Sequence, residues 1–432
     1  MSRIVHPPTR DSRRASTSVN NQSTPRISAS SLRRALPVPL RRLLVAAEAT
    51  ATARGITLWA VGGAPRDLAL GEAINDLDIA IDGDVGRFAR DLAVRLPEVE
   101  VGGVSAFGTA AVTLTTTGGA ARLDLARLRS ETYTRAGALP TVRWTRSIEG
   151  DLARRDFTVN AIALGLTGEH RGHLVDPFEG LADARARRLR VLHPRSFEDD
   201  ATRLWRGARI AAARRLRPDA ETARLIDDAT RWASMITGER WFGELDLTAR
   251  RGHTAGAVRL LDRWGVLRAI HPAWLVDSST QRALTRHTAP MPATRFAALL
   301  LAPLRDYPTI LTRLTVSSEV REVVRDAARL LALPEPASID DLATVERTSA
   351  EGRLAARWLA AHGTANWRAV DRWTRTKPAL AADEVVALGV LRGPALGQIL
   401  SELRRARYER TLTSKSAERE AVRRFIAREG SQ

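Results

Sequence analysis

Two carboxylates at the start of a short apolar run have the spacing of a metal site. Asp76 and Asp78 stand two residues apart and alternate with Leu77, Ile79 and Ile81. In a β-strand both carboxylates project to one face, with Cα atoms roughly 6.6 Å apart at about 3.3 Å per residue. They can then converge on a pair of metal ions roughly 3.5–4 Å apart, as two-metal phosphoryl transfer requires. Hard oxygen ligands without a neighbouring His favour Mg²⁺, whereas the alternative interpretation is an exposed acidic strand end.

A glycine turn precedes these carboxylates, in Val61-Gly62-Gly63-Ala64-Pro65-Arg66-Asp67. Two glycines let backbone N–H groups approach a phosphate, and the N-terminus of a following helix favours anions. We expect Gly63 to bind phosphate in this way and Arg66 to add a charge-assisted contact to the same phosphate. The alternative is an ordinary strand–turn–helix with Arg66 in solvent.

A third carboxylate follows on a later apolar run, at Asp124 in Leu123-Asp124-Leu125. It can complete the metal site or act as general base on an attacking hydroxyl. The alternative is an Asp at a strand end that caps a turn.

Hydrophobic periodicity predicts the elements that must hold these residues. Strands are expected at 57–61, 77–81, 110–114 and 121–125, and amphipathic helices at 40–54 and 85–96. After about residue 195 strand signals nearly vanish, and helical spacing runs to the end of the chain, broken by prolines. Residues 1–36 are rich in Ser, Arg and Pro, with Asp11 as their single acidic residue, which predicts a disordered basic arm. The expected fold class is α+β, a small head with a mixed sheet followed by an all-α remainder.

The composition indicates a globular protein with a polyanionic partner. The 432 residues carry a formal net charge of +18, for which nucleic acid is the first candidate. Lysine occurs only at Lys377 and Lys415, so part of the arginine excess can instead reflect a GC-rich genome. The lack of Cys excludes disulfides and zinc–thiolate sites and fits a reducing compartment, so we expect a cytoplasmic protein. No apolar run approaches the roughly 18–20 residues of a membrane span, and no membrane partner is expected.

With the glycine turn followed by Asp76-x-Asp78, the chain resembles the nucleotidyltransferases of the DNA polymerase β superfamily. More narrowly, it resembles the bacterial and eukaryotic class of CCA-adding tRNA nucleotidyltransferases and poly(A) polymerases. Further motifs agree in the family's order, from about residue 37 to 425. They lie at 124–140 (flexible loop region), 151–162 (ribose recognition), 176–183 (a turn), 199–206 (base selection), 260–267 (neck) and 393–400 (tail). The sequence departs from the family at Pro65, where Val is usual, at Asp199, where Glu is commoner, and at Glu409-Arg410, where a Gly is usual.

The base-selecting motif has a physical rationale. Asp200 and Arg203 are three residues apart on an expected helix, so they share a face. Asp offers only acceptors and Arg only donors, which complements the amino group and ring nitrogen of cytosine and of adenine. Uracil and guanine present a carbonyl oxygen beside an N–H, so the same pair rejects them. Arg206 and Arg209 continue the series toward the triphosphate, and the alternative is an Arg-rich surface helix.

The resemblance implies further roles and a domain order. Arg155 contacts the triphosphate, and Asp156 partners a ribose hydroxyl. Mg²⁺ is held by Asp76 and Asp78, with Asp124 as a candidate third carboxylate. The polymerase-β-like nucleotidyltransferase head occupies 37–190, a helical neck with the base-selecting motif 191–275, and a helical RNA-binding body and tail 276–432.

We therefore expect template-independent transfer of CMP and AMP from CTP and ATP to the 3′ end of tRNA, by a monomer or homodimer that releases pyrophosphate. An A-adding-only enzyme and a poly(A) polymerase share these motifs and stay open as alternatives. The intact region 131–147 argues against a CC-only enzyme, because such family members tend to lack that loop. A non-catalytic RNA-binding relative is a further alternative, against which the retained Asp76 and Asp78 count. A basic helical DNA-binding protein would explain the charge but not the ordered motifs.

Overall fold

The computed structural model describes residues 27–117, 119–360 and 365–429. The chain divides into two compact units. The first holds the residues up to Glu244 together with Gly256–Pro272, and the second holds Leu245–Ala255 and the residues from Ala273 onward. The first unit thus contains the expected head and most of the expected neck, with every candidate catalytic or nucleotide-binding residue.

In the described part of the first unit, seven strands form one mixed sheet in the order β3-β4-β5-β2-β1-β8-β9. They are β1 (Leu58–Val61), β2 (Leu77–Ile81), β3 (Val99–Val101), β4 (Thr109–Thr116), β5 (Gly119–Arg127), β8 (Ala163–Gly165) and β9 (Leu174–Val175). β2 and β5 run parallel, and the other neighbours are antiparallel. The four expected strands are confirmed as β1, β2, β4 and β5. β4 and β5 extend beyond their apolar runs because their pairing continues to Thr116 and Gly119.

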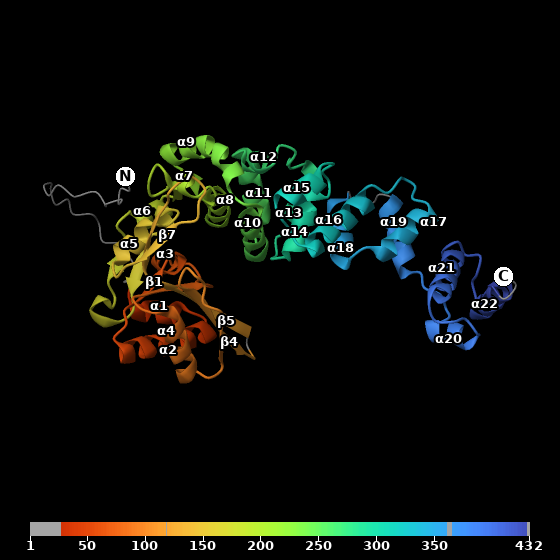
Figure 1. Ribbon diagram of the computed structural model, residues 1–432, viewed down its shortest axis with the longest axis horizontal. Helices are drawn as coiled ribbons and strands as arrows, with labels where there is room; N and C mark the ends of the chain where they lie inside the picture. Colours follow the sequence, from red (N-terminus) through yellow and green to blue (C-terminus); the bar gives the residue numbers. More distant parts are fainter. Residues whose placement is uncertain (1–26, 118, 361–364, 430–432) are drawn as a thin grey trace. The chain divides into compact units, whose positions relative to one another are not determined.

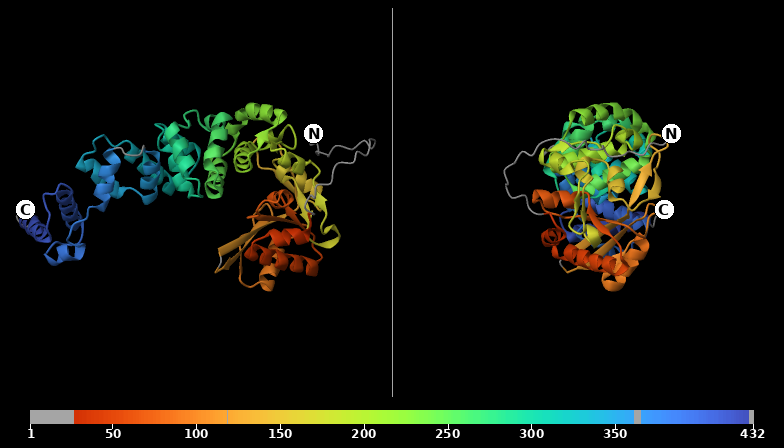
Figure 2. Two further views of the ribbon diagram at one scale, coloured as in Figure 1. Left: turned by 180° about the vertical axis from the view of Figure 1, so that it is seen from behind. Right: turned by 90° about the vertical axis from the view of Figure 1, so that its left-hand side faces the viewer.

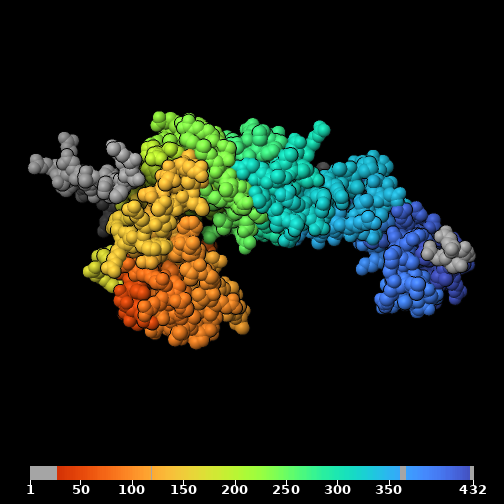
Figure 3. All heavy atoms as spheres, viewed as in Figure 1, coloured from red at the N-terminus to blue at the C-terminus, as the bar shows by residue number. Residues whose placement is uncertain are grey.

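Three helices cover one face of this sheet. α1 (Ala29–Ala35), α2 (Val38–Arg54) and α4 (Val85–Arg95) lie together beside the strands in Figures 1 and 2. Their buried apolar residues form one hydrophobic core with those of the sheet. These helices and strands β1–β5 together fall in the red and orange part of the space-filling view (Figure 3). The residues of β2 and β5 in this core are Leu77, Ile79, Ile81, Leu123 and Leu125. Because side chains alternate across a strand, Asp78 and Asp124 project from the opposite face.

The opposite face carries a smaller core. Trp59, Val61 and Ala80 from the sheet pack with Ile148 and Leu152 of α5 (Ile148–Ala153). This core covers only part of that face, so polar residues of β2 and β5 stay accessible beside it.

The N-terminal expectation needs a correction. Residues 1–26 of the expected disordered arm lie outside the described residues, but residues 29–35 form α1. Ser28 caps this helix by accepting a hydrogen bond from the backbone N–H of Ser31, and Leu32 and Leu36 are buried in the sheet core. The Ser- and Arg-rich composition hid a single apolar stripe, and burial of that stripe stabilises so short a helix.

The first unit also contains the remaining elements of the expected head and those of the expected neck. A hairpin of β6 (Arg129–Thr132) and β7 (Thr141–Trp144) precedes α5. The helix α3 (Gly63–Leu70) follows β1, and η1 (Thr158–Asn160), α6 (Gly180–Arg185), α7 (Ser196–Asp199) and α8 (Thr202–Arg214) follow α5. The remaining elements are η2 (Gly168–His170), β10 (Arg188–Leu189), β11 (Arg217–Pro218), α9 (Ala220–Ala229), η3 (Thr230–Met235) and α12 (Val266–Ile270). α10 (Gly238–Arg251) and α11 (Thr254–Arg263) contribute to both units.

Within its described residues, the second unit is entirely helical. Its helices are α13 (Ser278–Arg286), α14 (Ala293–Leu301), α15 (Tyr307–Arg313), α16 (Ser318–Leu331), α17 (Ile339–Thr344), η4 (Val345–Arg347), α18 (Ala350–Leu359), α19 (Ala365–Arg375), α20 (Ala382–Ala387), α21 (Pro394–Tyr408) and α22 (Lys415–Glu429). The last three enclose a small core of their own, which includes Leu380, Val385, Leu403 and Phe425. None of the described helices has the length and apolarity of a membrane span.

Candidate active site

The acidic side chains lie next to one another on the partly open face of the sheet. Asp78 of β2 is directly opposite Asp124 of β5 in the parallel register, so their Cα atoms are about 4.8 Å apart. Asp76 comes immediately before β2. Asp76 and Asp78 are exposed, while Leu77 and Ile79 are buried. The predicted alternation along this strand is therefore present, and it leaves the carboxylates accessible.

A guanidinium stands beside these carboxylates. Arg122 is two residues before Asp124 on β5, and its Nη2 lies 2.7 Å from the Asp124 Oδ1. The hydrogen bond and charge of Asp124, followed by the charges of Asp76 and Asp78, raise the pKa of Arg122. No group of three or more acidic or His side chains in the described chain converges as a metal cluster. The carboxylates still fit Mg²⁺, because this ion commonly takes one or two protein carboxylates and completes its shell with water and substrate phosphates.

The glycine turn brings the end of β1 against the same face. Gly62 has φ 75° and ψ −121°, a conformation that favours Gly, and its N–H donates to the Ile162 carbonyl at 3.0 Å. A Cβ atom there would lie 3.3 Å from the Arg155 Nη1 and 3.7 Å from the Asp78 Oδ2. Gly63 begins α3 immediately afterwards. The turn thus places backbone next to both a carboxylate and a guanidinium of the site.

Arg155 is held at the site by a buried carboxylate. Its Nη2 lies 3.0 Å from the Oδ2 of Asp151, whose side chain is 1% exposed. Burial acts to raise the pKa of Asp151, but the charges of Arg155 and Arg154 outweigh it and hold that pKa below its usual value. The Nε of Arg155 is buried and has no hydrogen-bond partner in the described chain. Arg155 lines a cavity of ≈ 420 Å³ with Asp78 and Asp124, as its predicted triphosphate contact requires.

The structure corrects the expectation for Arg66. Its guanidinium is buried and donates from Nε to the Asp67 Oδ1 at 2.9 Å and from Nη1 to the Asn160 Oδ1 at 2.7 Å. Burial lowers the pKa of Arg66 and raises that of Asp67. A guanidinium engaged in this way supports the back of the glycine turn, and neither the expected phosphate contact nor the solvent alternative describes it.

Asp156 is also placed differently from its expected ribose contact. It is 4% exposed, and its Oδ1 accepts from the Phe157 N–H at 2.8 Å and from the Asn160 Nδ2 at 3.1 Å. Its Oδ2 lies 3.0 Å from the Arg206 Nη2. Burial acts to raise the pKa of Asp156, but the Arg206 charge and the Asn160 hydrogen bond outweigh it and lower that pKa. The carboxylate therefore joins two segments of the protein and leaves little surface for a ribose hydroxyl.

The base-selecting residues do not share one helix. α7 ends at Asp199 and α8 begins at Thr202, so Asp200 lies in extended backbone between them. The Oδ1 of Asp200 accepts from the Thr202 N–H at 3.0 Å and from the Arg240 Nη2 at 2.7 Å. Arg203 is buried and donates to the Ser196 Oγ at 2.7 Å and to the Arg154 carbonyl at 3.0 Å. The expected common face is wrong because Asp200 lies in extended backbone before α8, where it accepts a hydrogen bond from the N–H of Thr202, the first residue of that helix.

Arg206 and Arg209 continue along α8 as expected, but both have protein partners. Arg206 pairs with Asp156 and keeps 40% of its side chain exposed. The Nη2 of Arg209 lies 3.3 Å from the Oε2 of Glu244, and the Arg209 side chain is 14% exposed. Of the two, only Arg206 offers substantial accessible surface to a nucleotide.

Sequence reasoning missed Arg240 of α10. It donates to the Asp200 Oδ1 and, through Nη1 at 3.1 Å, to the carbonyl of Gly137 in the β6–β7 loop. Gly137 also donates its N–H to the Glu198 carbonyl at 3.3 Å. Arg240 lies 40 residues after Asp200 in the chain and in no motif, so no local signal could have identified it.

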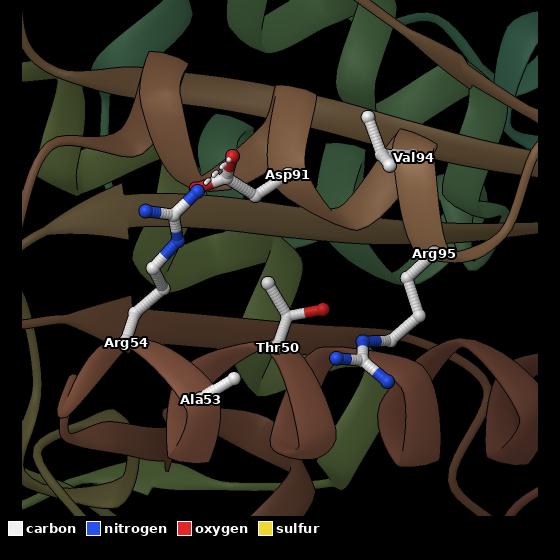
Figure 4. A pocket seen from close by; sticks show the side chains of 6 residues that line it. All are labelled: Thr50, Ala53, Arg54, Asp91, Val94 and Arg95. Atoms are coloured by element: carbon white, nitrogen blue, oxygen red, sulfur yellow. Dashed lines mark hydrogen bonds and ion pairs between the residues drawn. The ribbon is translucent and has the colours of Figure 1, made fainter.

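A second hollow of the first unit lies away from this chemistry. Figure 4 shows it between α2 and α4, lined by Thr50, Ala53, Arg54, Asp91, Val94 and Arg95. Arg54 and Asp91 pair across it at 2.8 Å. It opens beside the helices that cover the other face of the sheet, so the candidate active site is the cavity that contains Asp78 and Asp124.

The sheet, the acidic pair and the glycine turn define a nucleotidyltransferase head, and comparison with known proteins agrees. Residues 58–190 match the family model described as the Poly A polymerase head domain. A CC-adding tRNA nucleotidyltransferase from Deinococcus radiodurans is 34% identical over 375 residues, which cover 85% of this chain and 88% of the relative. An A-adding tRNA nucleotidyltransferase from Geobacter sulfurreducens is 35% identical over 231 residues, but this match spans only 26% of that longer relative.

Solved structures share the fold over most of the chain. The Thermotoga maritima CCA-adding enzyme complexed with tRNA covers 92% of this chain and 98% of its own, with a TM-score of 0.66 and 21% identity. A CCA-adding enzyme complexed with ATP gives a TM-score of 0.68 at 20% identity and covers 91% of this chain and 96% of its own. The chain belongs to the tRNA nucleotidyltransferase family that carries the poly(A) polymerase head domain, and it is a nucleotidyltransferase.

Proposed function

We propose that this protein adds CMP and AMP from CTP and ATP to the 3′ end of tRNA without a template, building or repairing the CCA terminus. The observation that carries the proposal is that Asp78, Asp124 and Arg155 line one cavity, with Gly62 of the glycine turn next to Arg155 and Asp78. These groups supply carboxylates, a guanidinium and the start of a helix, which suit the transfer of a nucleotide from a triphosphate.

In this reaction the residues of the site have separate roles. Gly63 at the start of α3 and Arg155, which lies next to Gly62, bind the triphosphate, so that the pyrophosphate leaves along the cationic side of the cavity. Asp76 and Asp78 hold Mg²⁺, with Asp124 beside them. The bound ion supplies charge neutralisation at the phosphate oxygens. The RNA 3′-hydroxyl attacks the α-phosphate from the side of the acidic strands.

Base selection rests on Asp200 and Arg203 at the start of α8. The Oδ1 of Asp200 is occupied by protein donors, whereas its Oδ2 accepts no hydrogen bond in the described chain. That oxygen is available for the exocyclic amino group of cytosine or adenine. Arg203 is only 3% exposed and must become accessible before it can donate to the base, so we propose that nucleotide binding repositions it. A cytoplasmic location follows from this proposal, because the substrate is tRNA.

The Deinococcus relative favours a second candidate, the addition of CC alone, because it matches most of this chain. Against it stands the region 131–147, in which β6 and β7 form an intact hairpin whose loop reaches Asp200 through Arg240. We therefore place addition of all three nucleotides first.

The test is nucleotide incorporation with purified protein and Mg²⁺ on three RNAs. These are tRNA that ends before CCA, tRNA that ends in CC, and an unstructured oligonucleotide, each with one of the four labelled NTPs at a time. Two C followed by one A on the shortest tRNA support the proposal, and two C without A support the second candidate. A alone on the CC-ended tRNA, or long A tracts on any RNA, contradict it in favour of an A-adding enzyme or a poly(A) polymerase. Tight tRNA binding without incorporation would identify a non-catalytic relative.

A further inference from the structure

A chain of polar contacts begins and ends on α8 and passes behind the glycine turn. It runs through six residues, which we call the α8 network. Its contacts are Arg214 Nη2 to Asp67 Oδ2 at 2.6 Å, Arg66 Nε to Asp67 Oδ1 at 2.9 Å, Arg66 Nη1 to Asn160 Oδ1 at 2.7 Å, Asn160 Nδ2 to Asp156 Oδ1 at 3.1 Å, and Arg206 Nη2 to Asp156 Oδ2 at 3.0 Å. Arg214 also pairs with Glu72.

The centre of the α8 network is buried. Arg66 is 6%, Asp67 5% and Asp156 4% exposed. Desolvation of charges is expensive, and a buried ion pair often adds little stability compared with apolar residues of the same shape. Each charged group here has a partner on a different segment of the chain. The α8 network therefore contributes more to the relative position of those segments than to the stability of the fold.

The segments joined in this way carry the two ends of the proposed nucleotide site. Arg66 lies against the turn, with its Nη2 3.2 Å from where a Cβ of Gly63 would be. Asn160 ends η1, and its carbonyl lies 3.5 Å from the Arg155 Nη1. These groups form the phosphate end. α8 begins two residues after Asp200 and contains Arg203, which form the base end.

The two attachments to α8 are well separated. Arg206 and Arg214 are eight residues apart, which corresponds to about 12 Å along a helix. A helix attached at two points this far apart is fixed in both position and tilt. Loss of one attachment would remove a polar contact that fixes that end of α8, beside the packing of its buried side chains.

We infer that the α8 network sets the distance between the phosphate-binding turn and the base-reading start of α8, and so allows one nucleotide to engage both ends at once. Arg66, Asp67 and Arg214 are then positioning residues. This inference rests on the proposed function for the identity of the ligand, and it adds residues that touch neither the phosphate nor the base.

The test compares two adjacent arginines at the end of α8. Arg214→Met removes one attachment at a side chain that is 30% exposed, so the fold should survive. Arg215→Met is the matched control, because Arg215 is exposed and lies outside the network. Arg214→Lys is the conservative variant that retains a cation for Asp67. Each protein is titrated calorimetrically with CTP and with inorganic tripolyphosphate, both with Mg²⁺, after circular dichroism and thermal unfolding have verified its fold.

Tripolyphosphate occupies the phosphate end only, whereas CTP needs both ends. For Arg214→Met we expect the Kd of CTP to rise about tenfold, toward that of tripolyphosphate, while the Kd of tripolyphosphate stays within about twofold. Arg215→Met should match the parent, and Arg214→Lys should recover most of the CTP affinity. The ratio of CTP to UTP incorporation should fall in parallel in Arg214→Met.

Three results would overturn the inference. The first is an equal loss of affinity for both ligands in Arg214→Met, which would mark a merely structural role. The second is an unchanged affinity of Arg214→Met for CTP. The third is a parent protein that does not bind CTP more tightly than tripolyphosphate. Because binding is measured without turnover, a parent that binds as expected but incorporates nothing refutes the proposed function alone.

Discussion

Asp151 offers the sharpest test of how the site is held together. Its side chain is 1% exposed and contacts Arg154 at 2.8 Å and Arg155 at 3.0 Å. Asp151→Asn keeps the shape but removes the charge from both pairs. Removing one partner of a fully buried ion pair commonly costs about 3–5 kcal/mol.

The cost here should be smaller, because both arginines keep another acceptor. Arg154 retains the Glu131 Oε1 at 3.2 Å, and Arg155 retains the Asn160 carbonyl at 3.5 Å. Hydrogen bonds to charged groups contribute about 1.5–3 kcal/mol each, and burial of the carboxylate already offsets part of its attraction. We therefore expect the free energy of unfolding to fall by about 1.5–3 kcal/mol at pH 7.

We expect the activity of Asp151→Asn to fall by more than the loss of folded protein would explain. Arg155 loses the partner that aims it into the cavity, so kcat/KM for CTP should fall at least about tenfold at a temperature where the variant is folded, which corresponds to about 1.4 kcal/mol. Glu149→Gln is the control, because Glu149 lies on the same helix and is exposed. Urea unfolding followed by circular dichroism, and steady-state incorporation of CMP, measure the two effects.

The lowered pKa of Asp151 predicts how its contribution to stability changes with pH. The folded pKa of Asp151 is below its ordinary value of 3.8, so its contribution is complete above that pH and is lost as the pH falls through the folded pKa. The stability difference between parent and Asp151→Asn should therefore shrink in acid. Parental stability and parental CTP kinetics in Asp151→Asn at pH 7 would refute the reasoning.

Three further predictions concern single residues. Gly62→Ala should lower incorporation at least about tenfold, because φ 75° disfavours a side chain and the new Cβ would approach the Arg155 Nη1 at 3.3 Å; steady-state kinetics measure it, and parental activity would contradict it. Burial lowers the pKa of His193 to about 4, below its unfolded value of 6.5, so protonation of the unfolded state should reduce stability as the pH falls from 6.5 to 4. In urea titrations, His193→Gln should flatten this dependence of stability on pH, and an unchanged dependence would argue against the role of His193. Glu418 is fully buried and accepts from the backbone N–H groups of Ala379 and Leu380 at 3.0 and 2.8 Å. Glu418→Gln should therefore destabilise the helices α20–α22 by about 1–3 kcal/mol. Amide hydrogen exchange should become faster in these helices, and protection equal to that of the parent would count against this role.

Periodicity along single strands predicted the acidic face well. The alternation of Leu77, Asp78 and Ile79 depends only on the period of two, and the sheet places Asp124 beside Asp78 because their two apolar runs pair in register. Arg155 was identified by resemblance to a family motif, and it lines the cavity.

Contacts between distant segments were not predictable in this way. Arg66 follows a phosphate-type turn, but its side chain is captured by Asp67 and by Asn160, 94 residues later. Asp156 likewise pairs with a residue that is distant in the chain, Arg206. No local pattern reports whether a charged side chain meets a ligand or a partner of opposite charge within the protein.

Helix boundaries caused the remaining error. Asp200 and Arg203 have helical spacing, but Asp200 accepts a hydrogen bond from the N–H of Thr202 and so precedes α8. The residue types themselves carried this signal, since Asp is favoured at the start of a helix and disfavoured within one.

The most direct test of the central claim compares the parent with Asp76→Ala on tRNA that lacks its CCA end. We predict that the parent extends this tRNA by C, C and A in the presence of Mg²⁺, and that Asp76→Ala binds the tRNA with parental affinity but extends it at least about a thousandfold more slowly. Extension by the variant at the parental rate, or no extension by the parent, would contradict the account of Asp76 and Asp78 as the residues that support nucleotide transfer.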